Sequence, residues 1–86
     1  MEIVIEPHTL KRAEERGASE AEILDVLETG DNKAAKKNRS AKSKVFDFNN
    51  TWNEKHYEQK RIEVIYTIES YKIVTVTVYV YYGKWE

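Results

Sequence analysis

The chain has 86 residues, a formal net charge of −1 and no cysteine. This length suits one small domain with a single hydrophobic core. Without cysteine the chain has no disulfide framework and no thiolate nucleophile, which fits a cytoplasmic protein. No apolar run approaches the roughly 20 residues of a membrane-spanning helix, so we expect no membrane association. The nearly balanced charge disfavours a protein that coats nucleic acid indiscriminately.

The residue types also exclude several kinds of site. A zinc site needs three or four ligands at suitable spacing, and the chain offers two histidines, far apart, and no cysteine. Its three glycines do not form a phosphate-binding loop. We therefore expect neither a metal nor another cofactor.

The N-terminal segment predicts a strand followed by a helix. Residues Glu2–Glu6 alternate polar and apolar side chains, and the apolar ones are β-branched, which is typical of a strand. Pro7 ends that strand and suits the first turn of a helix. We expect this helix to end at about Arg16, with Gly17 in the left-handed position after it.

A second capped helix is predicted directly afterwards. In the segment Ser19-Glu20-Ala21-Glu22, the Ser19 hydroxyl and the Glu22 carboxylate can form a capping box. The helix should run from Glu20 to about Thr29, with Gly30 ending it.

The rest of the chain predicts a loop and a sheet. Residues 31–43 carry almost no apolar side chains and indicate an exposed loop, whereas 44–49, 57–69 and 72–82 alternate as strands do. In the last strand we expect four valines on the face that the helices cover, at positions 74, 76, 78 and 80. The whole chain, 1–86, is thus predicted to be one α+β domain, with both helices on one face of a mainly antiparallel sheet of three to four strands.

The first predicted helix carries a histidine and two arginines at every fourth position: His8, Arg12 and Arg16. Successive side chains at this spacing turn by about 40°, so the three form one row roughly 12 Å long on the helix surface. Guanidinium groups match the oxygens of a phosphate, and an imidazole can move a proton. The position of His8 in the first turn, beside arginines, favours the neutral ring that a base requires. The alternative is structural: the arginines pair with nearby acids such as Glu15.

The predicted loop supplies a second group of cations. Six lysines and arginines lie between positions 33 and 44 with no acidic residue among them. Such a segment can bind RNA phosphates, or it can be a solvated loop that the charges keep soluble. The candidate RNA-binding residues are Arg16, Lys36, Lys37, Arg39, Lys42 and Lys44.

A row of hydroxyl-bearing residues on the last strand is the third candidate. Thr75, Thr77, Tyr79 and Tyr81 are predicted to share one face, with Arg61 across from them. RNA bases stack on such tyrosines. Equally, a second copy of the chain could cover this face.

Together, these segments resemble a known family. The opening from Pro7 to Ile23, with His-x3-Arg-x3-Arg-Gly and then Ser-x-x-Glu, is similar to the start of small bacterial and archaeal proteins classed as domain of unknown function 4258. The segments Arg61–Tyr66 and Ile73–Val76 are similar to their closing hairpin. That family resembles RelE-like and BrnT-like toxins, within the fold group of barnase, EndoU and colicin ribonucleases.

The resemblance implies a RelE-like domain and a metal-independent ribonuclease. On the matching positions it implies catalytic roles for His8, Arg12, Arg61 and Thr75, and Tyr79 is added from the tyrosine row. The expected function is a toxin-like endoribonuclease that acts on messenger or transfer RNA. One form of this hypothesis is an enzyme that acts at the ribosome. The alternative is a non-catalytic RNA- or protein-binding module. Expected protein partners are an antitoxin, and a second copy that binds through the edge of strand 72–82 or through the tyrosine face.

Overall fold

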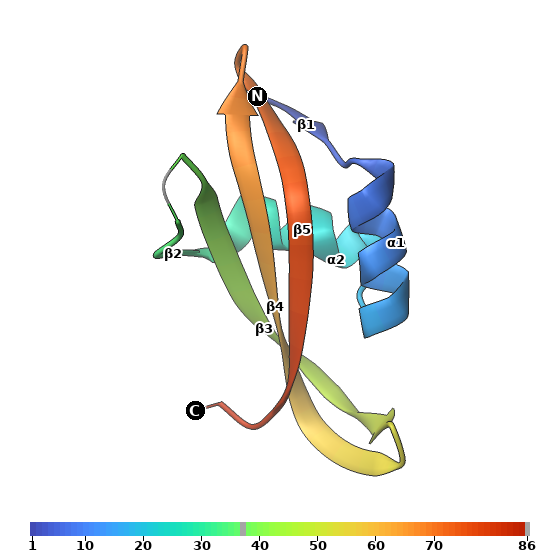
Figure 1. Cartoon of the computed structure of the whole chain (residues 1–86). Helices are drawn as coiled ribbons and strands as arrows, with labels where there is room; N and C mark the ends of the chain where they lie inside the picture. The colour runs from blue at the N-terminus through green and yellow to red at the C-terminus, as the bar shows by residue number, and fades with distance from the viewer. Residues whose placement is uncertain (37, 86) are drawn as a thin grey trace.

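The computed structural model describes residues 1–36 and 38–85. Figure 1 shows a long twisted sheet with two helices. In chain order the elements are β1 (Glu2–Val4), α1 (Pro7–Arg16), α2 (Glu20–Thr29), β2 (Asp31–Lys33), β3 (Ser40–Trp52), β4 (Lys55–Glu69) and β5 (Lys72–Gly83). Within the described residues, no helix is both long enough and apolar enough to cross a membrane.

The sheet has five strands in the order β1-β5-β4-β3-β2. The predicted α+β class is confirmed, but the prediction of a mainly antiparallel sheet of three to four strands is wrong. Strand β1 pairs parallel with β5, with Glu2 opposite Lys72, whereas the other three pairings are antiparallel. In the chain, both helices and strands β2 to β4 lie between β1 and β5. This long connection allows β5 to lie beside β1 in the same direction.

Both helices begin and end where the sequence predicts. Helix α1 starts with Pro7 and is followed by Gly17, which has φ 91° and donates its N–H to the Ala13 carbonyl at 2.8 Å. This left-handed backbone favours glycine, and the Tyr82 hydroxyl and the Trp52 ring fill the space where a Cβ would lie.

The predicted capping box starts α2. Its Ser19 hydroxyl accepts from the Glu22 N–H at 3.1 Å, and the Glu22 carboxylate accepts from the Ser19 N–H at 2.9 Å. Two of the orphan amides at this helix end are thereby satisfied.

The expected exposed loop 31–43 is wrong at both ends. Residues Asp31–Lys33 form the short edge strand β2, and β3 already begins at Ser40. The segment Asp31–Lys33 is exposed throughout and pairs only with residues 41–43 of β3. Its strand conformation comes from this pairing and not from an apolar pattern, so among the described residues of this segment the loop comprises 34–36 and 38–39.

Both helices pack on one face of the sheet. Helix α2 crosses behind β3, β4 and β5, and α1 lies alongside β5 (Figure 1). The core joins Ile23 and Val26 of α2 to Ile62 and Val64 of β4 and Val78 of β5, all with no solvent-exposed surface. Because side chains alternate along a strand, the intervening residues of β4 point to the opposite face, which neither helix covers. We call this second face the open face.

A β-bulge overturns the predicted valine face of the last strand. The pairing of β4 with β5 shifts between Ile65 and Tyr66: Ile65 lies opposite Thr77, but Tyr66 lies opposite Thr75. One extra residue in β5 exchanges the two faces of the strand at this point. Thr75 therefore lies on the helix-covered face with Val78, and the alternation of four valines against four hydroxyl-bearing residues does not hold.

A buried lysine ties the corner between the helices to the sheet. Lys60 is only 7% exposed, and its Nζ donates to the Gly17 carbonyl at 2.8 Å and to the Glu22 carboxylate at 3.0 Å. Beside it, the Tyr82 hydroxyl donates to the Arg16 carbonyl at 2.7 Å. These contacts join the C-terminal end of α1 and the capping box of α2 to the central strands.

Candidate functional site

The open face carries a pocket of about 370 Å³ between the sheet and the loop 34–39. A volume in this range can hold a nucleotide-sized group. Its floor comes from β4 and β5, whose facing residues pair across the strands as Glu63 with Tyr79 and Ile65 with Thr77. The full lining is Ala34, Ala35, Lys36, Arg39, Glu63, Ile65, Thr77 and Tyr79. The pocket therefore combines two cations, one carboxylate and two hydroxyl groups.

Arg16 reaches from α1 to the edge of this pocket. Its Nη1 donates to the Val78 carbonyl at 2.6 Å, and its guanidinium lies 5.2 Å from the ring centre of Tyr79. Tyr79 is still 41% exposed, so the contact orients the ring without burying it. The arginine expected to bind a flanking phosphate thus positions a wall of the pocket.

Arg61 lies next to the pocket on the same face. Its guanidinium is 4.8 Å from the ring centre of Tyr81 and 5.8 Å from that of Trp85. Its Nη1 is 3.7 Å from a carboxylate oxygen of Glu63, which is too long for a hydrogen bond. Its Nε is buried and has no hydrogen-bond partner among the described residues. The prediction that Arg61 and Tyr79 share a face is confirmed.

The expected composite site does not form around His8. His8 is exposed at the N-terminal end of α1, and Arg12 pairs with Glu15 at 2.8 Å on the same helix. Neither residue lines the pocket. Helix α1 packs against the covered face, and of its row only Arg16 reaches the open face that carries Arg61. The expected convergence of Arg61 and the threonines on His8 is therefore wrong.

Thr75 is also removed from the site by its position. It is 2% exposed, donates to the Thr9 hydroxyl at 2.9 Å and accepts from the Glu6 N–H at 3.0 Å. A threonine hydroxyl has one donor hydrogen and two acceptor lone pairs. The contacts with Thr9 and Glu6 use the hydrogen and one lone pair within the fold. Thr75 joins α1 to β5, and the bulge explains why the sequence pattern placed it on the wrong face.

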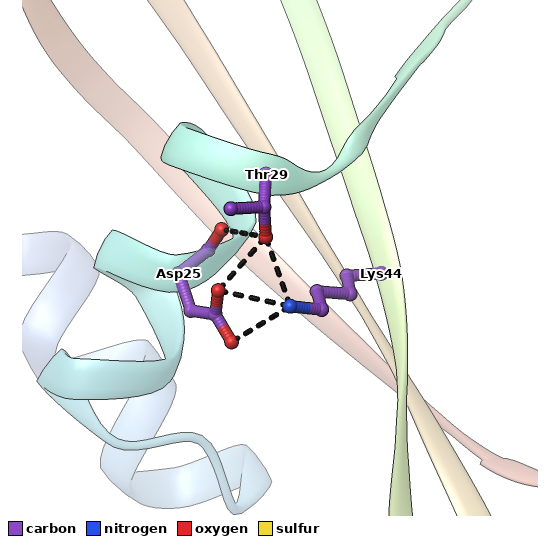
Figure 2. A network of polar contacts seen from close by, with 3 residues as sticks. All are labelled: Asp25, Thr29 and Lys44. Carbon is purple, nitrogen blue, oxygen red and sulfur yellow. Dashed lines mark hydrogen bonds and ion pairs between the residues drawn. The ribbon is translucent and has the colours of Figure 1, made fainter.

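Two of the candidate RNA-binding lysines are held against α2. Figure 2 shows that the Lys44 Nζ lies between Asp25 and Thr29, 2.9 Å from both carboxylate oxygens and from the threonine hydroxyl. The hydrogen bonds from Lys44 and Thr29 hold the pKa of the Asp25 carboxyl below its usual value. Lys42 donates to the Leu27 carbonyl at 3.0 Å. Cations at the C-terminal end of a helix also favour its dipole.

The described basic residues of the loop lie at the pocket, unlike the lysines of β3. Lys36 and Arg39 line the pocket, and the Arg39 N–H donates to the Lys36 carbonyl at 3.0 Å. Lys37 lies outside the described residues. Lys42 and Lys44 differ from Lys36 and Arg39, because their positions in β3 face the helices and not the pocket.

Glu63 is the residue of this site that the sequence analysis missed. It stands two positions after Arg61, and in a strand this spacing places both on one face. This spacing is the signal in the sequence that places Glu63 beside Arg61. Within the described part of the chain, no group of three or more histidines or acids could hold a metal ion.

The edge of β5 is less accessible than the sequence suggests. Strand β1 pairs with Lys72, Ile73 and Val74, and Arg16 occupies the Val78 carbonyl. Binding of a second copy along the edge of strand 72–82 would have to displace these contacts. The tyrosine face does not meet this obstacle.

Comparison of the chain with protein-family models, with curated proteins and with solved structures gave no match. The resemblance to the family of unknown function 4258 and to RelE-like toxins therefore stays a prediction from the sequence motifs.

Proposed function

We propose that the protein is a toxin-like endoribonuclease that needs no metal ion and cleaves RNA in the pocket on the open face. The observation that carries this proposal is the composition of the pocket: Lys36 and Arg39 face it together with Glu63 and the hydroxyls of Thr77 and Tyr79. RNA supplies its own nucleophile, the 2′-hydroxyl, so a ribonuclease needs a base, an acid and cations around the phosphate.

The pocket offers a group for each role. Glu63 accepts the proton of the 2′-hydroxyl, whose oxygen then attacks the adjacent phosphorus. The bond from phosphorus to the 5′-oxygen breaks, and that oxygen takes a proton from Tyr79 or from water. A 2′,3′-cyclic phosphate and a free 5′-hydroxyl result. Arg39 and Lys36 stabilise the additional charge on the phosphate oxygens.

In this scheme Glu63 replaces His8 as the base. Arg61 keeps its predicted role near the phosphate and orients the Glu63 carboxylate, with which it forms the 3.7 Å ion pair. Tyr79 keeps its predicted role as well, with Arg16 as its positioning residue. His8 and Arg12 lie outside the pocket and are not required for the cleavage step.

A non-catalytic binding module is the second candidate. It is favoured by the pocket lining, which contains one carboxylate and no imidazole. The same cations would then hold RNA that is bound and not cut. A protein covering the open face would compete with RNA in either case, as an antitoxin would.

The decisive experiment is cleavage of an end-labelled RNA in the presence of a metal chelator. We expect Glu63→Gln to lower the cleavage rate by about 10²–10⁴-fold, the usual contribution of a general base, with little change in RNA affinity. His8→Ala should cleave like the wild type and is the matched control. An RNA with a 2′-deoxy residue at the cleaved position should bind but stay intact, because its nucleophile is missing.

Three results would contradict the proposal in different ways. Cleavage that Glu63→Gln leaves unchanged would exclude the pocket carboxylate as the base. Cleavage that is lost in His8→Ala would move the reaction to α1. RNA that binds to the wild type but is never cut would establish the binding module.

A further inference from the structure

The guanidinium of Arg61 contacts two aromatic rings beside the pocket, in addition to its ion pair with Glu63. It lies 4.8 Å from the ring centre of Tyr81 and 5.8 Å from that of Trp85, with its Nε buried and without a partner among the described residues. Its one described ion pair, to Glu63, is longer than a hydrogen bond. Its terminal N–H groups therefore have capacity for an acceptor.

The surroundings hold this arginine in a fixed orientation. The backbone N–H of Trp85 donates to the Gln59 side-chain oxygen at 2.6 Å, which fixes the main chain that carries the indole. Arg61 and Tyr81 are direct partners in the pairing of β4 with β5. A planar guanidinium that is already oriented loses little conformational entropy when it binds a phosphate.

This group is continuous with the pocket. Glu63 both lines the pocket and pairs with Arg61, and Tyr79 stands two residues before Tyr81 on the same face of β5. Residues two apart in a strand are roughly 6.8 Å apart, which places the second ring beside the first. Tyr79 and Tyr81 are exposed to almost the same extent, 41% and 42%.

We infer that Arg61, Tyr81 and Trp85 form a second nucleotide subsite beside the pocket, so that the ligand is single-stranded RNA at least two nucleotides long. One nucleotide occupies the pocket, the next base stacks on Tyr81, and the phosphate between them is bound by Arg61. Only an unpaired base can offer its face to a tyrosine, and for this reason a duplex is excluded. This inference rests on the proposed RNA binding in the pocket but does not require cleavage.

The test compares ligands of increasing length on wild type and variants. The ligands are adenosine monophosphate, the dinucleotide ApA, a ten-nucleotide oligoadenylate made uncleavable by 2′-deoxy residues, and a duplex of that length. Binding is followed by tryptophan fluorescence, and for the decamer also by anisotropy of a labelled strand. Tyr81→Ala and Arg61→Lys are the test variants, the latter keeping the charge but losing the planar fork. Tyr71→Ala is the matched control, because Tyr71 is exposed and lies in the distant turn between β4 and β5.

We expect the dinucleotide and the decamer to bind about tenfold or more tightly than the mononucleotide, and the duplex to bind more weakly than the decamer. Tyr81→Ala should remove about tenfold of the decamer affinity and leave mononucleotide binding unchanged. Arg61→Lys should also lower the decamer affinity by about tenfold, and it should lower the mononucleotide affinity by less than that. Tyr71→Ala should change neither. Circular dichroism of each variant establishes that the fold is intact.

The outcomes separate this inference from the proposed function. If mononucleotide binding requires Arg39 but the dinucleotide binds no more tightly, nucleotide binding in the pocket is supported and the second subsite is refuted. If no RNA ligand binds at all, both are refuted. If Tyr81→Ala abolishes self-association of the chain and leaves RNA binding unchanged, the tyrosine face is an interface between protein copies.

Discussion

The hydroxyl of Thr75 donates a 2.9 Å hydrogen bond to the hydroxyl of Thr9, and both side chains are almost fully buried. This contact, together with the bond from the Glu6 N–H, joins the start of α1 to β5. A residue to which the family resemblance assigned a catalytic role is thus part of the joint between a helix and the sheet.

Thr75→Val should lower the free energy of unfolding by about 1–3 kcal/mol, because the nearly isosteric side chain leaves two buried polar groups without a partner. Denaturant unfolding measures the loss. Thr77→Val is the matched control: its hydroxyl faces the pocket, so we expect a change of stability within about 0.5 kcal/mol and weaker RNA binding. Equal stability of Thr75→Val and wild type would show that the buried hydroxyl contributes nothing to the fold.

Lys60 and Glu22 form a partly buried pair whose members should depend on each other. Lys60→Ala removes the partner of a carboxylate and of the Gly17 carbonyl, so we expect a loss of about 3 kcal/mol. Lys60→Met keeps the aliphatic packing, and in combination with Glu22→Gln it should cost less than the sum of the two single changes. A double-mutant cycle by chemical denaturation measures this coupling. Strict additivity would contradict the pairing.

The pocket cations Lys36 and Arg39 should contribute to RNA binding, whereas Lys44 of β3 should not. Arg39→Gln and Lys36→Gln should weaken RNA binding, and each should reduce the slope of log affinity against log salt by about 1. Lys44→Gln should leave both quantities unchanged, because its ammonium group is bound to Asp25 and Thr29. A salt series of binding isotherms provides the comparison. An equal effect of Lys44→Gln and Arg39→Gln would mean that the whole segment acts as one solvated cationic surface.

The same lysine controls the titration of Asp25. The pKa of the Asp25 carboxyl is lowered mainly by the Lys44 hydrogen bonds, so its contribution to stability is complete above the pKa of the unfolded chain. That contribution is lost as the pH falls through the lower pKa of the folded state. In Lys44→Gln, carboxyl chemical shifts measured by NMR should show the pKa of Asp25 moving upward toward its ordinary value. An unmoved titration would contradict the network in Figure 2.

Tyr82 should make the fold sensitive to alkaline pH. Burial and the nearby Glu22 charge raise its pKa from the ordinary 10.0 to about 12. Since the folded state favours the neutral phenol, this contribution to stability is complete below the ordinary pKa of the unfolded chain. It is lost as the pH rises through the folded value. Unfolding experiments across this range should show a decline that is smaller in Tyr82→Phe. Identical alkaline profiles would refute the perturbed phenol.

Local chemistry was sufficient to predict the helices. Pro7 and Gly17 bound α1, and the capping box of Ser19 and Glu22 starts α2, because caps act through contacts within a few residues along the chain. The α+β class follows from these elements and the alternation in the strands, and so does the placement of Arg61 and Tyr79 on one face.

Tertiary structure decided the rest, since strand pairing depends on partners distant in sequence. The bulge opposite Ile65 and Tyr66 turned Thr75 toward the helices, and a period-two pattern contains no sign of such a shift. Pairing with β3 made a strand of polar residues 31–33, and packing of α2 brought Lys42 and Lys44 into hydrogen bonds with that helix. The amino-acid sequence alone thus determined which groups the protein possesses, whereas register and packing determined that Glu63, and not His8, shares a pocket with Lys36 and Arg39.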